Sequence, residues 1–158
     1  MCIRDSYTHA GPEIAVASTK AFLAQITAAY LLGLYLAQLN KKLFSGQIKD
    51  ILADLGAIPG KIEEILAAKD QVKELARSMA DATSVLFLGR NVGYPVAMEG
   101  ALKLKELAYI HAEGFAAGEL KHGPIALIDD GQPVFVVMPS PLDRHSLHAK
   151  VCLLYTSP

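Results

Sequence analysis

Three charged residues on one predicted helix are the first candidates for chemistry in this chain. They are Glu99, Lys103 and Glu106, in the stretch that reads YPVAMEGALKLKELAYIHAEG from residue 94. At about 100° per residue they fall within roughly 60° of one another, whereas Lys105 lies about a third of a turn away. The rest of this helix is mostly apolar, so we expect it to pack on more than one side. The charged stripe either lines a cleft or forms ion pairs on a solvated face, and the spacing alone leaves both interpretations open.

The segment after this helix, 114–124, has the composition of a loop that carries a site. It holds three glycines together with Glu119, Lys121 and His122 before Pro124. Glycines permit unusual backbone conformations, and titratable groups on loops are frequent in binding and catalytic sites. This composition favours the cleft over the solvated face.

The bulk composition excludes several classes of function. The chain has 158 residues, 52% hydrophobic and 20% charged, which suits a globular domain or part of one. A formal net charge of −1 gives no electrostatic basis for binding nucleic acid. The two cysteines, Cys2 and Cys152, have no spacing that predicts a metal site or a disulfide framework. Because Met1–Ser6 lacks the apolar core of a secretory signal, we expect a cytoplasmic protein.

A long apolar helix is predicted at Ala21–Leu39. Its nineteen residues approach the length that spans a bilayer, but Gln25, Thr27 and Gln38 interrupt them. A buried helix at a domain or subunit interface is therefore favoured, and no membrane partner is expected.

The residues before this helix could cap it or could bind an anion. Ser18 and Thr19 are good N-cap candidates, and Lys20 follows them. A helix N-terminus of this kind can hold a phosphate or a carboxylate. Plain helix capping is the favoured interpretation.

The remaining pattern predicts an α/β fold with a helical N-terminal half. Two amphipathic helices, 47–58 and 60–68, are expected on either side of Pro59-Gly60, followed by a third at 72–82. Short apolar strands are then predicted, with the charged helix between the first two, at 84–88, 109–112 and 133–138. Strand, helix and strand in succession predict a parallel sheet flanked by helices.

The sequence predicts neither a cofactor nor a metal. The spacing of Gly89 and Gly93 matches neither a dinucleotide-binding motif nor a Walker loop. His111-Ala-Glu113 matches one half of a deaminase zinc motif, but the P-C-x-x-C half is missing.

Two long motifs resemble the isomerase half of the glucosamine-6-phosphate synthases, the glutamine–fructose-6-phosphate aminotransferases. They are AGPEIAVASTKAF at 10–22 and FLGRNVGYPVAMEGALKLKELAYIHAEGFAAGELKHGPIALI at 87–128. The resemblance implies two sugar-isomerase (SIS) domains, each a parallel sheet flanked by helices, as part of a doubly wound three-layer fold. It places the end of the first SIS domain and a helical connector at 8–82, and the start of the second at 83–150. The two ends, 1–7 and 151–158, resemble non-native tails.

The resemblance also implies catalytic roles for three residues. Glu106 is expected to be the base that moves a proton between C1 and C2 of the fructosimine intermediate. His122 is expected to open the sugar ring, in the active site of the other subunit. Lys103 is expected to stabilise an enolate-like charge.

Three further residues are expected to bind the substrate. Val16 and Ser18 resemble positions that contact the sugar in the first SIS domain, and Glu99 shares the charged stripe. An alternative role for Glu99 is to orient Lys103.

The family's partners follow from the same resemblance. They are a sugar phosphate (fructose 6-phosphate or glucosamine 6-phosphate), a second subunit in a homodimer, and a glutaminase domain upstream. The phosphate-binding loop would lie before residue 8 and the Schiff-base lysine after residue 150, so we expect this stretch alone to have no synthase activity. With half of each sheet missing, apolar strand edges such as 84–88 are expected to be exposed. Two alternatives remain: another SIS-domain isomerase or deglycase, and a sugar-phosphate-binding regulator without catalysis.

Overall fold

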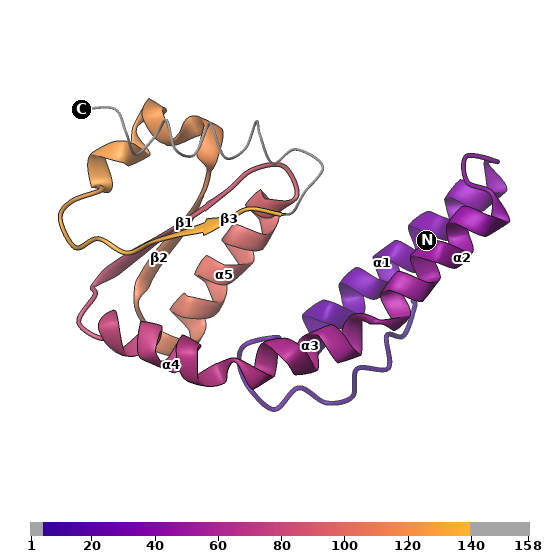
Figure 1. Ribbon diagram of the computed structural model, residues 1–158, viewed down its shortest axis with the longest axis horizontal. Helices are drawn as coiled ribbons and strands as arrows, with labels where there is room; N and C mark the ends of the chain where they lie inside the picture. The colour runs from indigo at the N-terminus through magenta and orange to yellow at the C-terminus, as the bar shows by residue number, and fades with distance from the viewer. Residues whose placement is uncertain (1–4, 140–158) are drawn as a thin grey trace. The chain divides into compact units, whose positions relative to one another are not determined.

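The computed structural model describes residues 5–139, which divide into two compact units between Ala76 and Arg77. The first is helical, and the second contains a parallel sheet (Figure 1). This confirms the predicted α/β class with its helical N-terminal half.

The first unit is built from helices joined by short turns. They are α1 (Lys20–Leu39), α2 (Ser45–Gly56), α3 (Ile58–Ala67) and most of α4 (Lys69–Ser78). The chain turns at Ala57, and Pro59-Gly60 lies inside the first turn of α3 rather than between two helices. The predicted break was wrong by two residues because proline has no N–H to lose in the first turn of a helix.

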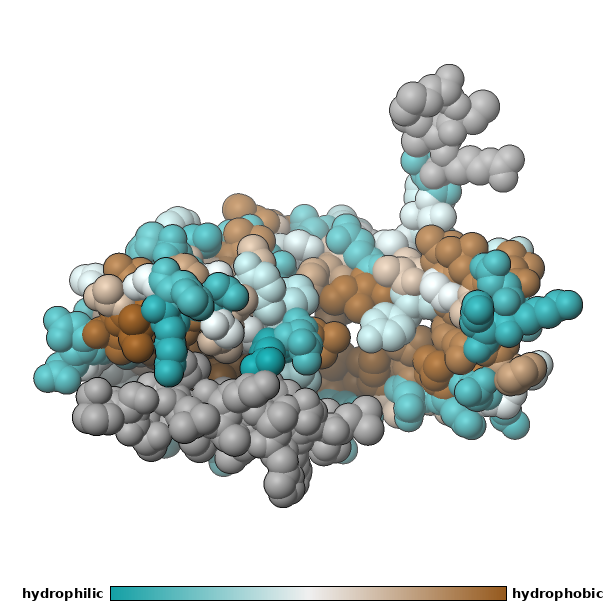
Figure 2. Space-filling view, turned by 90° about the horizontal axis from the view of Figure 1, so that it is seen from above, coloured by the Kyte–Doolittle hydropathy of each residue, from teal (hydrophilic) through white to brown (hydrophobic). Residues whose placement is uncertain are grey.

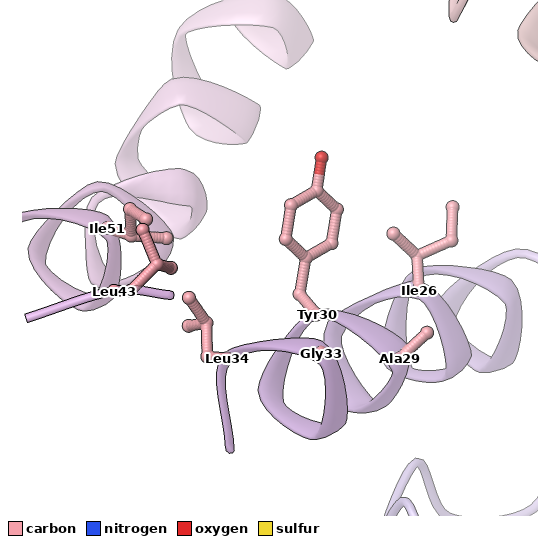
Figure 3. A pocket seen from close by; sticks show the side chains of 7 residues that line it. All are labelled: Ile26, Ala29, Tyr30, Gly33, Leu34, Leu43 and Ile51. Atoms are coloured by element: carbon pink, nitrogen blue, oxygen red, sulfur yellow. The ribbon is translucent and has the colours of Figure 1, made fainter. Parts of the chain in front are cut away.

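Helix α1 is more exposed than predicted. Leu34 is its one buried residue, and among the described residues α1 is the helix long and apolar enough to cross a membrane. Length and composition do not separate such a span from the core helix of a soluble protein. α1 packs against α2, and an apolar groove of about 440 Å³ lies between them (Figure 3). Its lining is formed by Ile26, Ala29, Tyr30, Gly33, Leu34, Leu43 and Ile51.

The second unit is a three-stranded parallel sheet. Its strands are β1 (Ser84–Gly89), β2 (His111–Ala116) and β3 (Val134–Val137), in the order β2-β1-β3. Helix α5 (Gly93–Ala108) connects β1 to β2, and two 3-10 helices, η1 (Ala117–His122) and η2 (Pro124–Leu127), precede β3 (Figure 1). The predicted strand–helix–strand unit is confirmed.

Two of the finer predictions for this unit were wrong. The second strand begins at His111 and continues to Ala116. The segment 114–124, which was expected to be a loop, therefore begins within β2 and continues as η1. β1 is the central strand, paired with β2 and with β3, and is therefore not an exposed edge.

Two apolar clusters cover the two faces of the sheet. On one face Val85 and Ala112 pack with Ala101 of α5, and the rings of Phe87 and Phe135 stack with centroids 5.0 Å apart. On the other face Leu88 packs with side chains of η1. Helical segments therefore lie on both sides of the sheet, as the predicted layered fold requires.

Many apolar side chains remain at the surface of both units (Figure 2). On α5 the exposed fractions of Val96, Met98 and Leu107 are 54%, 49% and 60%. In the described part of the chain α5 is therefore packed on one side, not on several as predicted.

Candidate functional site

Helix α5 is held close to the sheet by small residues at its contacts. Ala97 and Ala101 are buried, and Gly114 of β2 lies directly beneath Met98. A methyl group at Gly114 would come within 2.8 Å of the Met98 Cα atom. The close approach fixes which face of α5 turns toward the sheet and leaves the charged stripe on another face.

The charged stripe forms a connected cluster centred on Lys103. Its Nζ atom lies 3.2 Å from Glu99 Oε1 and 2.8 Å from Glu106 Oε2. The three side chains are between 21% and 26% exposed, so the cluster is partly shielded from water. Lys105 is exposed and makes neither of these contacts. The geometric prediction from the helical spacing is confirmed.

The cluster keeps Lys103 in its charged form. The hydrogen bond that its ammonium donates to Glu106 raises the pKa of Lys103, and burial opposes this effect more weakly. In the described part of the chain, no other hydrogen bond engages the Glu106 carboxylate. A carboxylate fixed beside a permanent positive charge can accept a proton from a carbon acid, while the ammonium stabilises the negative charge that develops.

His122 lies at the other end of the sheet from Glu106. It is the last residue of η1, and η1 follows the carboxyl end of β2, where Leu120 packs on Leu88. Glu106 lies in the last turn of α5, which leads into the amino end of β2 (Figure 1). The six residues of β2 span about 16 Å. The second unit therefore does not bring His122 and Glu106 together.

Val16 and Ser18 belong to the first unit, in the bend that precedes α1. Val16 is 92% exposed, Ser18 is half-buried, and Ala17 between them is fully buried.

Glu13 organises this bend and was not found from the sequence. Its Oε2 atom accepts hydrogen bonds from the backbone N–H groups of Thr19, at 3.3 Å, and of Ala21, at 3.2 Å. Its Oε1 atom accepts a third, from the Thr19 hydroxyl, at 3.4 Å. These contacts, that to Ala21 foremost, lower the pKa of Glu13.

The predicted cap of α1 is corrected by the same contacts. Thr19 is the N-cap residue, but neither it nor Ser18 caps the helix with its side chain. The Glu13 carboxylate satisfies the free N–H groups instead, so a carboxylate of this chain occupies the predicted anion position. An acid seven residues before the first residue of an apolar helix is the signal that could have revealed it.

Other polar side chains form no larger site in the described residues. His111 Nε2 lies 4.0 Å from Glu113 Oε1, and both side chains are largely exposed. Within residues 5–139, no group of three or more His, Cys, Asp or Glu side chains is arranged to hold a metal ion.

The contact between Gly114 and α5 gives a stability prediction. Replacing Gly114 with alanine should destabilise the second unit by about 1–3 kcal/mol, because the new methyl group must displace the α5 backbone at Met98. The matched control is Gly118→Ala, whose methyl group would meet nothing within 4 Å. Denaturant unfolding of the full-length protein compares the two. Equal stability of both variants would contradict the close packing.

The sequence of this chain is similar to a known domain family and to several known proteins. Residues 78–153 match the SIS domain family. The chain is 72% identical over 145 residues to the glutamine–fructose-6-phosphate aminotransferase (isomerizing) of Corynebacterium efficiens. It is 73% identical over 146 residues to the enzyme of the same name from Corynebacterium diphtheriae. Each match covers 92% of this chain but 23% of the relative, so the chain spans about a quarter of the length of these proteins.

Solved structures show the same fold. The C-terminal domain of glucosamine-fructose-6-phosphate aminotransferase from Francisella tularensis superimposes with a TM-score of 0.88 at 38% identity, covering 93% of this chain and 42% of that one. A putative phosphosugar isomerase from Clostridium difficile 630 gives a TM-score of 0.78 at 22% identity, over 93% of this chain and 42% of that one. The second likeness supports the fold alone.

Proposed function

Since residues 78–153 match the SIS domain family, we propose that this chain forms part of the sugar-isomerising half of a glutamine–fructose-6-phosphate aminotransferase. The observation that carries the proposal is the Glu99–Lys103–Glu106 cluster, which lies within a chain 72% identical to an enzyme of that name. The reaction would convert fructose 6-phosphate and ammonia released from glutamine into glucosamine 6-phosphate.

Glu106 would carry the proton in the isomerisation step. After ammonia has condensed with the C2 carbonyl to a protonated imine, with loss of water, the carboxylate removes a proton from C1. A C1–C2 double bond forms, and the electron pair of the C2–N double bond moves to the nitrogen, which becomes a neutral amine. Return of a proton to C2 and loss of the O1 proton then give the aldehyde of glucosamine 6-phosphate. A single base on one face of the sugar can both remove the proton from C1 and return a proton to C2.

Lys103 would stabilise the charge that develops during this step. Its ammonium is held by two carboxylates and stays protonated, so it supplies a fixed positive charge beside the base. Glu99 would orient this ammonium and approach the substrate.

His122 would open the sugar ring in the site of a second subunit. Its position beyond the carboxyl end of β2, about one strand length from Glu106, supports a site completed by two copies of the chain. We therefore propose a homodimer. Val16 and Ser18 would contact the sugar, and the phosphate would bind to residues outside this chain.

A cytoplasmic location fits this proposal, because the substrates are soluble metabolites. The exposed apolar face of α1 would then be covered by other parts of the full-length enzyme, and no membrane is invoked. A glutaminase domain elsewhere in the full-length protein would supply the ammonia.

Assay of the full-length protein with fructose 6-phosphate and either glutamine or ammonia tests the proposal. Glucosamine 6-phosphate should form from both nitrogen donors, while residues 1–158 alone should give no turnover. Isomerisation of fructose 6-phosphate to glucose 6-phosphate without amination in the full-length protein would point to another SIS enzyme. Absence of any turnover in the full-length protein would refute the proposal.

A further inference from the structure

The segment from Glu13 to Ala21 is a loop closed at its base by one side chain. Glu13 reaches across the loop to the first residues of α1 and accepts three hydrogen bonds there. Lys20 Nζ donates a fourth bond across the same base, to the Pro12 carbonyl oxygen, at 2.7 Å. Between these ends the chain forms a bend without helix or strand.

The middle of this loop is exposed on either side of one buried residue. Fully buried Ala17 anchors it, while Val16 is 92% exposed and Ser18 is half-buried. A short segment with one anchor and no regular backbone hydrogen bonds keeps its shape only if its ends are fixed. The contacts of Glu13 supply that constraint.

The contacts of Glu13 also influence which part of a substrate can approach the N-terminus of α1. The first N–H groups of α1 would attract a phosphate, but they already bind the Glu13 carboxylate. The Glu13 carboxylate would repel a second anion, such as a phosphate, at the N-terminus of α1. The loop therefore suits a neutral, hydroxyl-bearing part of a ligand.

We propose that Glu13 is a positioning residue, which shapes the Val16–Ser18 segment for the hydroxyl groups of the sugar and keeps the phosphate away from the N-terminus of α1. This inference rests on the proposed function. Glu13 takes no part in proton transfer, so its effect should appear in substrate binding.

Steady-state kinetics of the full-length enzyme test the role of Glu13. For Glu13→Ala, the KM for fructose 6-phosphate should rise about tenfold, while kcat changes less than about threefold. Glu13→Gln should recover most of the affinity, because its amide oxygen can still accept from the backbone N–H groups and its amide N–H can donate to the Thr19 hydroxyl. The matched control is Glu64→Ala, which removes an exposed acid in α3 and should leave both constants unchanged.

The outcomes separate this inference from the proposed function. If the unmodified enzyme aminates fructose 6-phosphate but Glu13→Ala keeps its KM within about twofold, the positioning role is overturned and the function stands. If the unmodified enzyme has no such activity, the proposed function fails. If Glu13→Ala fails to fold, Glu13→Gln becomes the test of the positioning role. An unchanged thermal midpoint with a small, measurable rise in the KM for fructose 6-phosphate supports that role. Loss of thermal stability in Glu13→Gln with an unchanged KM indicates a structural role alone and overturns the proposal.

Discussion

Replacing Glu106 with glutamine should lower the conversion of fructose 6-phosphate by about a thousandfold, because removing a general base costs on the order of 10²–10⁴ in rate. The amide has the shape of the carboxylate, and its oxygen can still accept the hydrogen bond that Lys103 donates at 2.8 Å. It cannot accept a proton from carbon. The loss should therefore fall on kcat, with the KM for the sugar nearly unchanged.

Two measurements separate loss of the base from loss of the fold. Glutamine hydrolysis, which we assign to a separate domain, should stay within about twofold of the unmodified enzyme, since the α5 contacts are preserved. The matched control is Glu64→Gln in α3, an exposed acid outside the cluster. Retention of more than about a tenth of the amination rate by Glu106→Gln would contradict the assignment of Glu106 as the base.

Replacing Lys103 with methionine should reduce kcat by about a hundredfold, in the range seen when a single charge-stabilising group is removed. Methionine keeps much of the length of the side chain but removes the ammonium that contacts Glu99 and Glu106. Both carboxylates then lose their partner, so the thermal midpoint should also fall. Kinetics and thermal unfolding of the same preparation measure the two effects.

Lys105 provides the matched control on the same helix. It is exposed and lies outside the cluster, so Lys105→Met should change kcat by less than about threefold. Similar losses for Lys103→Met and Lys105→Met would show that only the overall charge of α5 matters, and would remove Lys103 from the mechanism.

The periodicity of the sequence was sufficient to predict the charged cluster. Side chains three and four positions apart on a helix must be neighbours, so the spacing of Glu99, Lys103 and Glu106 is enough to group them. The strand–helix–strand order followed equally from Ser84–Leu88 and Pro133–Met138, whose apolar runs are bounded by turn residues. Both features depend only on the local spacing of charged and apolar residues along the sequence.

Features that depend on tertiary contacts could not be predicted in the same way. A strand was predicted at 109–112, but its true extent was not. The sequence of β2, HAEGFA, is rich in small residues with low strand propensity, and the strand continues to Ala116 because β1 pairs with it from Ser84 to Gly89. The role of Glu13 depends on a bend that has no periodic signature. Whether α1 is buried or exposed depends on the segments that pack against it, and the composition of α1 does not specify those segments.

Mixing two inactive variants tests most directly whether Glu106 and His122 of different subunits form one site. Glu106→Gln and His122→Ala would be co-expressed in the full-length enzyme with different affinity tags, and the mixed dimers isolated through both tags. Each variant alone should be inactive, whereas a mixed dimer contains one intact site of two and should show about half of the unmodified activity. Mixed dimers as inactive as either parent would contradict a site shared between two copies of this chain.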